Sequence, residues 1–374
     1  MTQLSSRNVS LDVFRGMTVC FMIIVNTPGD WSFLYSPLEH AAWHGFTPTD
    51  LVFPSFLFAV GNAMAFVFAK AEIQGNSAFL LKISKRTFLI FLIGFLLYWF
   101  PFVEWSGDSI FMKPLSETRI PGVLQRIALC YFFASLLIHF LSEKKVLLVS
   151  VFLLFLYWFL LVFFGDNSDP LSLTGNAVLK LDVFLFGESH LYHGEGIAFD
   201  PEGLLSTIPA VVNVIAGFFA GNLIRRKGSS YESISNLMVV GSILISLALF
   251  WHLVFPVNKK LWSSSFVLLT IGIDLIILSV LIYFIELKQK NVSVYFFTVF
   301  GKNPLFIYVL SGILISLFYI FPSHENSLHH FIFYSLFSSF LNPYNASLSF
   351  AIVYTLTCWF FGYILDKRKI YIKL

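Results

Sequence analysis

Apolar runs of about 20 residues recur along the whole chain, and these runs constrain the fold more than any other feature. An α-helix of this length crosses the hydrocarbon core of a lipid bilayer. The composition agrees, because 57% of the 374 residues are hydrophobic and only 12% are charged, too few charges to cover a soluble protein. The sequence therefore predicts an all-α, polytopic transmembrane helix bundle and excludes a string of soluble domains.

About ten spans are expected, and residues 1–374 are interpreted as a single integral-membrane domain. The short aromatic segment 328–341 is interpreted as an interfacial or re-entrant helix, because an eleventh span there would place the basic C-terminus outside. The three cysteines lie within apolar runs, so no disulfide framework is expected. The predicted spans are 11–27, 50–69, 84–103, 121–141, 145–164, 204–224, 234–256, 262–285, 303–321 and 346–366.

Basic residues are distributed unevenly between alternating connections, and this asymmetry predicts the orientation. One set of termini and connections holds most of the 24 basic residues, namely Arg7, Lys70, Lys82, Lys85, Arg86, Lys144, Lys145, Arg225, Arg226, Lys227, Lys288, Lys290, Lys302, Lys367, Arg368, Lys369 and Lys373. The opposite set holds only Lys113, Arg119, Lys180, Lys259 and Lys260. Because basic residues stay on the cytoplasmic side, both termini are predicted to be cytoplasmic and the chain to lie in the cytoplasmic (inner) membrane.

Side chains that could carry chemistry are concentrated between Asn26 and Gly61, on the predicted outer side. Here His40 and Asp50 lie ten residues apart, and Trp43 suits a membrane–water boundary. An imidazole titrates near neutral pH and can accept a proton, and a nearby carboxylate can hold its tautomer. This stretch is interpreted as the active site.

The longest connection, 165–203, is also predicted to face outward, into the periplasm. It is strongly acidic and ends next to Asp200 and Glu202. A connection of this length is either disordered or functional. It is interpreted as a periplasmic lid whose carboxylates attract a cationic amine, with Asp200 and Glu202 as candidate substrate-binding residues.

Several stretches together resemble a bacterial member of the heparan-α-glucosaminide N-acetyltransferase family of transmembrane acyltransferases. The LDxxRG piece is shared with other membrane acyltransferases, whereas the block H-x-x-W-x-G-x-T-x-x-D-x-x-F-P is specific. The resemblance extends from the first span to the ninth. The matching pieces are SLDVFRG at 10–16, VNTPG at 25–29, HAAWHGFTPTDLVFPSFLFAVG at 40–61, RIPGVLQRIALCYF at 119–132, HGEGIAFDPEGLLSTIPAVVNVIAGFFAG at 193–221, NKKLWSSSFVLLT at 258–270 and GKNPLFIYV at 301–309.

The resemblance implies that an acetyl group passes from cytosolic acetyl-CoA, used as co-substrate, to the amine of a glucosamine-type sugar across the membrane. It implies His40 as the catalytic histidine and general base, Asn26 as the active-site asparagine and Asp50 as the acid that follows. Position 44 is His where relatives can have Asn, so no catalytic role is expected for His44. Animal members carry an extra lumenal domain and a further span, and this sequence is expected to lack both.

Four further positions are candidate binding residues. Asp12 and Arg15 are three residues apart at the cytoplasmic start of the first span, where they form either a local ion pair or a contact to a CoA phosphate. Gln125 and Arg126 begin the fourth span, and intramembrane charges usually face a cavity or a partner. Arg126 is assigned to the co-substrate, and Gln125 is assigned to the sugar together with Trp43.

A metal site and a nucleic-acid partner are not expected. His40 and His44 have ligand spacing only if they lie on a helix, which Pro37, Gly45 and Pro48 disfavour. The expected partners are the amino sugar and membrane lipid, with a homodimer left open.

The alternative function is an amino-sugar permease coupled through two intramembrane charges, Asp274 and Arg126. Asp274 could pair with Arg126 or with another buried donor, or it could stay neutral. Against a permease, the chain shows no internal repeat and no paired interrupted helices, which many secondary transporters have.

Overall fold

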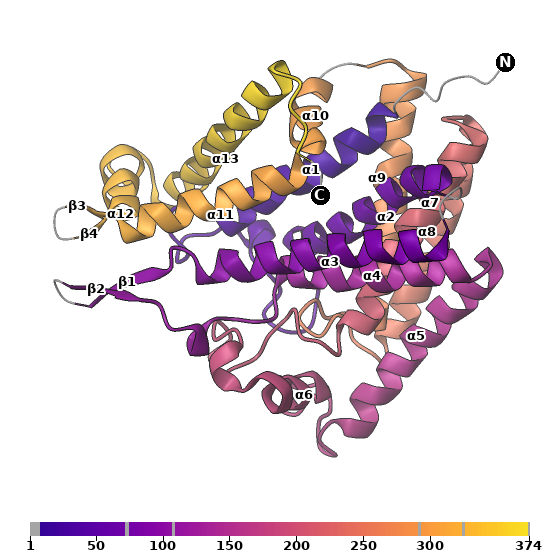
Figure 1. The fold of residues 1–374 in the computed structure, drawn as a ribbon, viewed down its shortest axis with the longest axis horizontal. Helices are drawn as coiled ribbons and strands as arrows, with labels where there is room; N and C mark the ends of the chain where they lie inside the picture. Colours follow the sequence, from indigo (N-terminus) through magenta and orange to yellow (C-terminus); the bar gives the residue numbers. More distant parts are fainter. Residues whose placement is uncertain (1–7, 72–74, 107–108, 291–292, 324–325, 373–374) are drawn as a thin grey trace.

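The computed structural model describes residues 8–71, 75–106, 109–290, 293–323 and 326–372, so Arg7 and Lys373 lie outside the described residues. The chain is 72% helical, and long helices cross one another in a bundle (Figure 1). This confirms the all-α polytopic class. The long helices are α1 Val9–Asn26, α2 Val52–Ala71, α3 Asn76–Trp99, α4 Val123–Phe140, α5 Glu143–Phe164, α7 Thr207–Lys227, α8 Tyr231–His252, α9 Ser264–Leu281, α11 Pro304–Ile320 and α13 Pro343–Lys367.

Each of the predicted spans coincides with one of these helices, but they are not equally apolar. Among the described residues, eight helices are long and apolar enough to cross a membrane, or nine if the bent pair of α10 (Val294–Lys302) and α11 counts as one span. Helix α3 differs from the others because Lys82, Lys85 and Arg86 occupy its first half. The apolar part of α3 is therefore limited to its second half, which is shorter than the other apolar spans.

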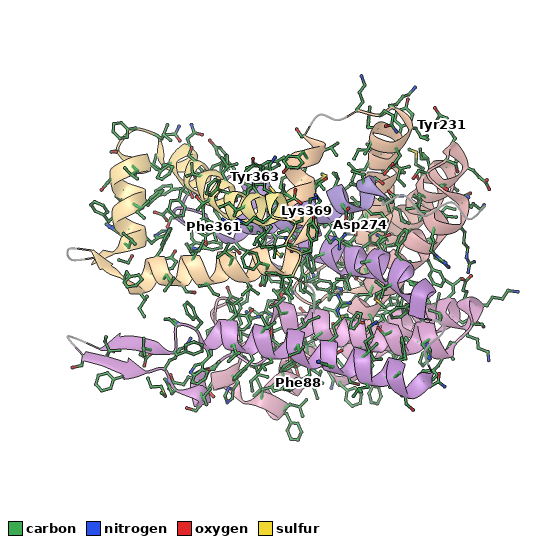
Figure 2. All side chains as sticks on the ribbon, turned by 45° about the horizontal axis from the view of Figure 1, so that its top comes forward. Phe88, Tyr231, Asp274, Phe361, Tyr363 and Lys369 are labelled. Atoms are coloured by element: carbon green, nitrogen blue, oxygen red, sulfur yellow. The ribbon has the colours of Figure 1, made fainter. Side chains whose placement is uncertain are left out.

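The exterior of the bundle is apolar, as contact with lipid requires. Phe88 on α3 is 64% exposed and lies at the periphery, whereas Asp274 on α9 is fully buried (Figure 2). This arrangement, with apolar side chains on the exterior and a carboxyl group in the interior, is the reverse of that in a soluble protein. It agrees with a multi-pass membrane protein.

Helices α2 and α7 pack backbone against backbone in the centre of the bundle. A Cβ on Gly61 of α2 would lie 1.8 Å from the Val214 carbonyl oxygen, and one on Gly217 of α7 would lie 1.9 Å from the Phe58 carbonyl oxygen. Glycine is therefore required on both helices at this crossing. The contact fixes α2, and Asp50 lies two residues before the start of this helix.

Two features of the last third depart from a simple row of spans. Helices α10 and α11 meet at an angle of 83°, because Pro304 begins α11 and Asn303 between them bonds to the C-terminal segment, its side-chain amide donating to the Ile370 carbonyl. The short helix expected at 328–341 is present as α12 Leu328–Phe333, followed by a π-helical turn over Tyr334–Ser338.

The connections that are predicted to face outward are folded, and they contain the described strands. After α3, β1 Val103–Ser106 pairs antiparallel with β2 Ser109–Met112, and β3 Pro322–Ser323 pairs with β4 Asn326–Ser327 before α12. The long 165–203 connection contains α6, Ala177–Phe186, which lies at the bottom of Figure 1, far from the N-terminus. The connection is thus an ordered layer, while its role as a lid stays a prediction.

Candidate active site

A cavity of about 610 Å³ opens between the C-terminal end of α1, the connection that follows it, the start of α4 and the middle of α11. A concave site with a few converging polar groups is the usual form of a ligand pocket. The polar and charged side chains that line it are Asn26, Thr27, Glu39, His40, Thr49, Tyr98, Arg119, Tyr192, Glu195, Glu202, Lys259, Lys260, Tyr308, Ser311 and Ser316.

His40 lines this cavity and is bonded to Asp50 behind it. The His40 Nδ1 atom lies 2.6 Å from Asp50 Oδ1. The other carboxylate oxygen accepts bonds from the backbone N–H groups of Thr47 and Ala41, at 2.9 and 3.2 Å. A carboxylate with these donors is an acceptor, so Nδ1 carries the His40 proton and Nε2 keeps its lone pair.

The local fold explains why residues ten apart meet. Thr47 and Asp50 form a capping box at the start of the 3₁₀ helix Pro48–Leu51, which continues directly into α2. Asp50 is 1% exposed, while the His40 side chain is 39% exposed. The carboxylate is thus fixed inside the protein and the imidazole is presented to the cavity.

The charge state of His40 follows from its surroundings. Burial lowers the pKa of His40 below its ordinary value of about 6.5, and the positive charge of Lys259 lowers it further. The bond to Asp50 acts in the opposite direction without reversing the shift. His40 is therefore a neutral imidazole at neutral pH, ready to accept a proton.

Asn26 is the last residue of α1 and lines the same cavity as His40. The chain after it is held on α13, since the Gly29 N–H donates to the Ser347 carbonyl at 3.2 Å and the Ser347 hydroxyl donates to the Asp30 carbonyl at 2.9 Å. The end of α1 is thus fixed. The side-chain amide of Asn26 can supply an N–H donor to the cavity that His40 also lines.

Arg119 forms a cluster on the cavity wall that the sequence interpretation did not find. Its guanidinium donates two bonds to Asp200, at 2.7 and 2.6 Å, and one to Glu202 at 2.6 Å. The rings of Tyr98 and Tyr192 lie on it, each at 4.9 Å. The one available signal was the position of Arg119 in the RIPG piece that resembles the family.

Asp200 and Glu202, the two predicted acidic substrate ligands, differ in their access to the cavity. Asp200 is fully buried behind Arg119 and does not line the cavity, because both its oxygens are bonded to the guanidinium. Glu202 lines the cavity. Burial acts to raise its pKa, but Lys259 and then Arg119 outweigh burial and hold the pKa of Glu202 below its ordinary range.

Three other residues from the sequence interpretation lie away from the cavity. The indole N–H of Trp43 donates to the Leu171 carbonyl at 2.9 Å, and its ring packs on Phe199 in the 165–203 connection. His44 is exposed, and its Nδ1 lies 3.2 Å from the Asn258 amide. Gln125 is 2% exposed and packs against Gly94 of α3. None of the three lines the cavity, and substrate binding by Trp43 or Gln125 stays a prediction.

The predicted co-substrate residues are placed at two ends of the bundle. Arg15 donates to Asp12 at 2.7 Å in the first turns of α1, at the end opposite Asn26. Arg126 is buried in α4, where it donates to the Gly203 carbonyl at 2.8 Å and its guanidinium carbon lies 4.9 Å from the Trp262 ring centre. Binding of a CoA phosphate by any of them stays a prediction.

The proposed pairing of Asp274 with Arg126 is wrong. Asp274 accepts a bond from the Ser55 hydroxyl of α2, while the bonds of Arg126 go to the turn before α7. No ion pair joins the two residues, and Asp274 is bonded to another buried donor instead. Within the described ranges, no group of three or more His, Cys, Asp or Glu side chains could hold a metal ion.

The fold and this cavity define a class: a multi-pass membrane protein with a carboxylate-oriented imidazole on one cavity wall and an amide on another. Residues 7–243 match the family model described as heparan-α-glucosaminide N-acetyltransferase, catalytic. The chain therefore belongs to the heparan-α-glucosaminide N-acetyltransferase family.

Two curated relatives carry the same description. The heparan-α-glucosaminide N-acetyltransferase of Homo sapiens is 30% identical over 367 aligned residues, which cover 83% of this chain and 53% of the human protein. That of Mus musculus is 28% identical over 357 residues, covering 80% of this chain and 52% of the mouse protein. The chain thus spans about half the length of the curated relatives it matches.

Proposed function

We propose that this protein transfers an acetyl group from cytosolic acetyl-CoA to the amine of a glucosamine-type sugar on the outer side of the membrane, with His40 as general base. The observation that carries the proposal is the 2.6 Å contact of His40 Nδ1 with Asp50 in a cavity that Asn26 also lines. Family membership supports N-acetyl transfer, and the predicted orientation assigns the two substrates to opposite sides.

Proton removal is the step assigned to His40. An amine attacks a thioester carbonyl through its lone pair, and the new nitrogen–carbon bond leaves the nitrogen positively charged until it loses a proton. The unprotonated Nε2 of His40 accepts that proton. Asp50, bonded at Nδ1, stabilises the imidazolium that forms and keeps the ring in place.

Acetyl transfer also requires a group that stabilises the negative charge on the thioester oxygen. As the amine attacks, the thioester oxygen becomes an oxyanion, and the Asn26 amide is the donor proposed to stabilise it. Collapse of this intermediate breaks the carbon–sulfur bond, and the imidazolium of His40 returns its proton to the leaving thiolate. The products are the N-acetylated sugar and CoA, with His40 restored.

Each substrate has its own proposed route. Acetyl-CoA enters from the cytoplasmic side, with its phosphates near the basic face and its pantetheine arm extending through the bundle toward Asn26 and His40. The sugar enters from outside beneath the 165–203 connection. The proposal that acetyl-CoA is cytosolic goes with a location in the cytoplasmic membrane.

The test is acetyl transfer by purified protein given labelled acetyl-CoA and a panel of amino sugars, with product read by mass. His40→Ala should lower turnover by roughly 10²–10⁴-fold, because the attacking amine then lacks a positioned proton acceptor. Acetyl-CoA affinity should change little, since the nucleotide is proposed to bind at the other face. His44→Ala is the matched control and should stay within a few-fold, because His44 lies outside the cavity.

Near-normal turnover in His40→Ala together with an inactive His44→Ala would show that the wrong histidine was chosen. Uptake of sugar without acetylation by the unmodified protein would favour the permease.

A further inference from the structure

Lys259 lies in a tightly bonded turn before α9. The Trp262 N–H donates to the Lys259 carbonyl at 3.1 Å, and the Ser263 N–H donates to the Asn258 carbonyl at 3.0 Å. The Asn258 side chain closes the turn further by accepting from the Leu261 N–H at 2.8 Å. A turn with this many internal bonds holds its backbone in one conformation.

The same turn is attached to the connection that carries His40. The Gly45 N–H donates to the Val257 carbonyl at 2.8 Å, and the Lys260 ammonium donates to the Ala42 carbonyl at 2.8 Å. These bonds flank Lys259 on both sides. Its side chain lines the active-site cavity together with His40.

Lys259 also differs from the other cations of the cavity. Arg119 is paired with Glu202 and Asp200, and Lys260 is paired with Glu195 at 2.5 Å. Among the residues the structure describes, Lys259 has no carboxylate within ion-pair distance. Its charge is therefore not neutralised by a direct partner.

We propose that the positive charge of Lys259 keeps His40 in its unprotonated, proton-accepting form when the acceptor amine arrives; this rests on the proposed function. Lys259 is a positioning residue that acts through His40. The same charge disfavours an ammonium ion beside it, so an amine that enters the cavity also loses its proton more readily. This accounts for a lysine in a cavity that accepts an amine.

The other charges around His40 fix the direction of the effect. Asp50 and Glu202 both favour the imidazolium, whereas burial and Lys259 both oppose it. The remaining charged side chains of the cavity are Glu39, Arg119, Glu195 and Lys260, the last three in ion pairs. Removing the Lys259 charge therefore takes away one of the effects that oppose protonation of His40, and the pKa of His40 rises.

The experiment is a pH–rate profile of the purified full chain with acetyl-CoA and glucosamine. In Lys259→Met the acid limb of kcat should move to higher pH, so the rate near pH 6 falls several-fold while the alkaline plateau is largely kept. Lys259→Arg keeps the charge and should restore the limb. Lys180→Met is the matched control: its limb should stay in place, because Lys180 pairs with Asp166 in the 165–203 connection and does not line the cavity.

A second readout does not depend on transfer. A reagent that acylates only unprotonated imidazole is applied across the same pH range, and modification of His40 is followed by peptide mass. The midpoint of His40 modification should rise in Lys259→Met, return in Lys259→Arg and stay unchanged in Lys180→Met.

The outcomes separate the two proposals. Unchanged midpoints in Lys259→Met by both readouts, or an equal shift in Lys180→Met, would overturn the role of Lys259. A shifted acylation midpoint in a protein that acetylates none of the amino sugars would support the control of His40 by Lys259 and contradict the proposed function.

Discussion

At the level of single side chains, the site depends on which nitrogen of His40 is free. Asp50 accepts bonds from the His40 ring, from two backbone N–H groups and from the Thr47 hydroxyl at 3.1 Å. All these donors favour a charged carboxylate, and only a charged acceptor holds the Nδ1 proton firmly. The free Nε2 of His40 is therefore a consequence of the Asp50 environment.

Asp50→Asn tests this dependence. The amide keeps the shape of the side chain but can donate to Nδ1, which would move the ring proton to Nε2 and remove the base. We expect kcat to fall on the order of 10²-fold or more, with KM for the sugar little changed. Thr47→Val, which removes one of the donors to Asp50, is the milder comparison. Wild-type kcat in Asp50→Asn would mean that Asp50 does not set the tautomer.

At the level of helices, apolar run length predicted the long elements because each span must satisfy its backbone bonds internally. The meeting of His40 and Asp50 was also within reach, since the two are ten residues apart and a local capping box with Thr47 fixes Asp50. The Arg119 cluster could not be predicted from the sequence, because Arg119 and Asp200 are 81 residues apart. Counting charges does not show which distant loops come together. The α10–α11 bend depends likewise on Asn303 contacting the C-terminal segment.

The α2–α7 crossing fixes α2, which follows directly on the 3₁₀ helix that carries Asp50. Gly61→Ala tests this helix contact. A Cβ there would lie 1.8 Å from a backbone carbonyl that cannot move without shifting α7. We expect a loss of stability of roughly 1–3 kcal/mol, as for other overpacked interiors, measured as a lower midpoint of thermal unfolding in detergent.

Gly75→Ala is the matched control for this change, because nothing lies within 4 Å of the added carbon. Equal midpoints in the two variants would show that the helices are not in contact at Gly61.

For the molecule as a whole, the cavity lies at the end of α1 that carries Asn26, while the ion pair of Asp12 and Arg15 lies at the other end. A helix of 18 residues is about 27 Å long, close to the thickness of a bilayer core. Acetyl-CoA bound from the cytoplasm and a sugar bound from outside can meet only if one of them reaches across. The proposed route gives this task to the pantetheine arm.

The most direct measurement uses sealed vesicles containing the protein in one orientation. That orientation is established by an impermeant thiol reagent acting on single cysteines placed at 170–195 or 226–232. Acetyl-CoA is supplied only on the 226–232 side and glucosamine only on the 170–195 side. Acetylated sugar should accumulate on the sugar side, and His40→Ala vesicles should make little. Product formed only when both substrates share one side would contradict acetyl transfer across the membrane.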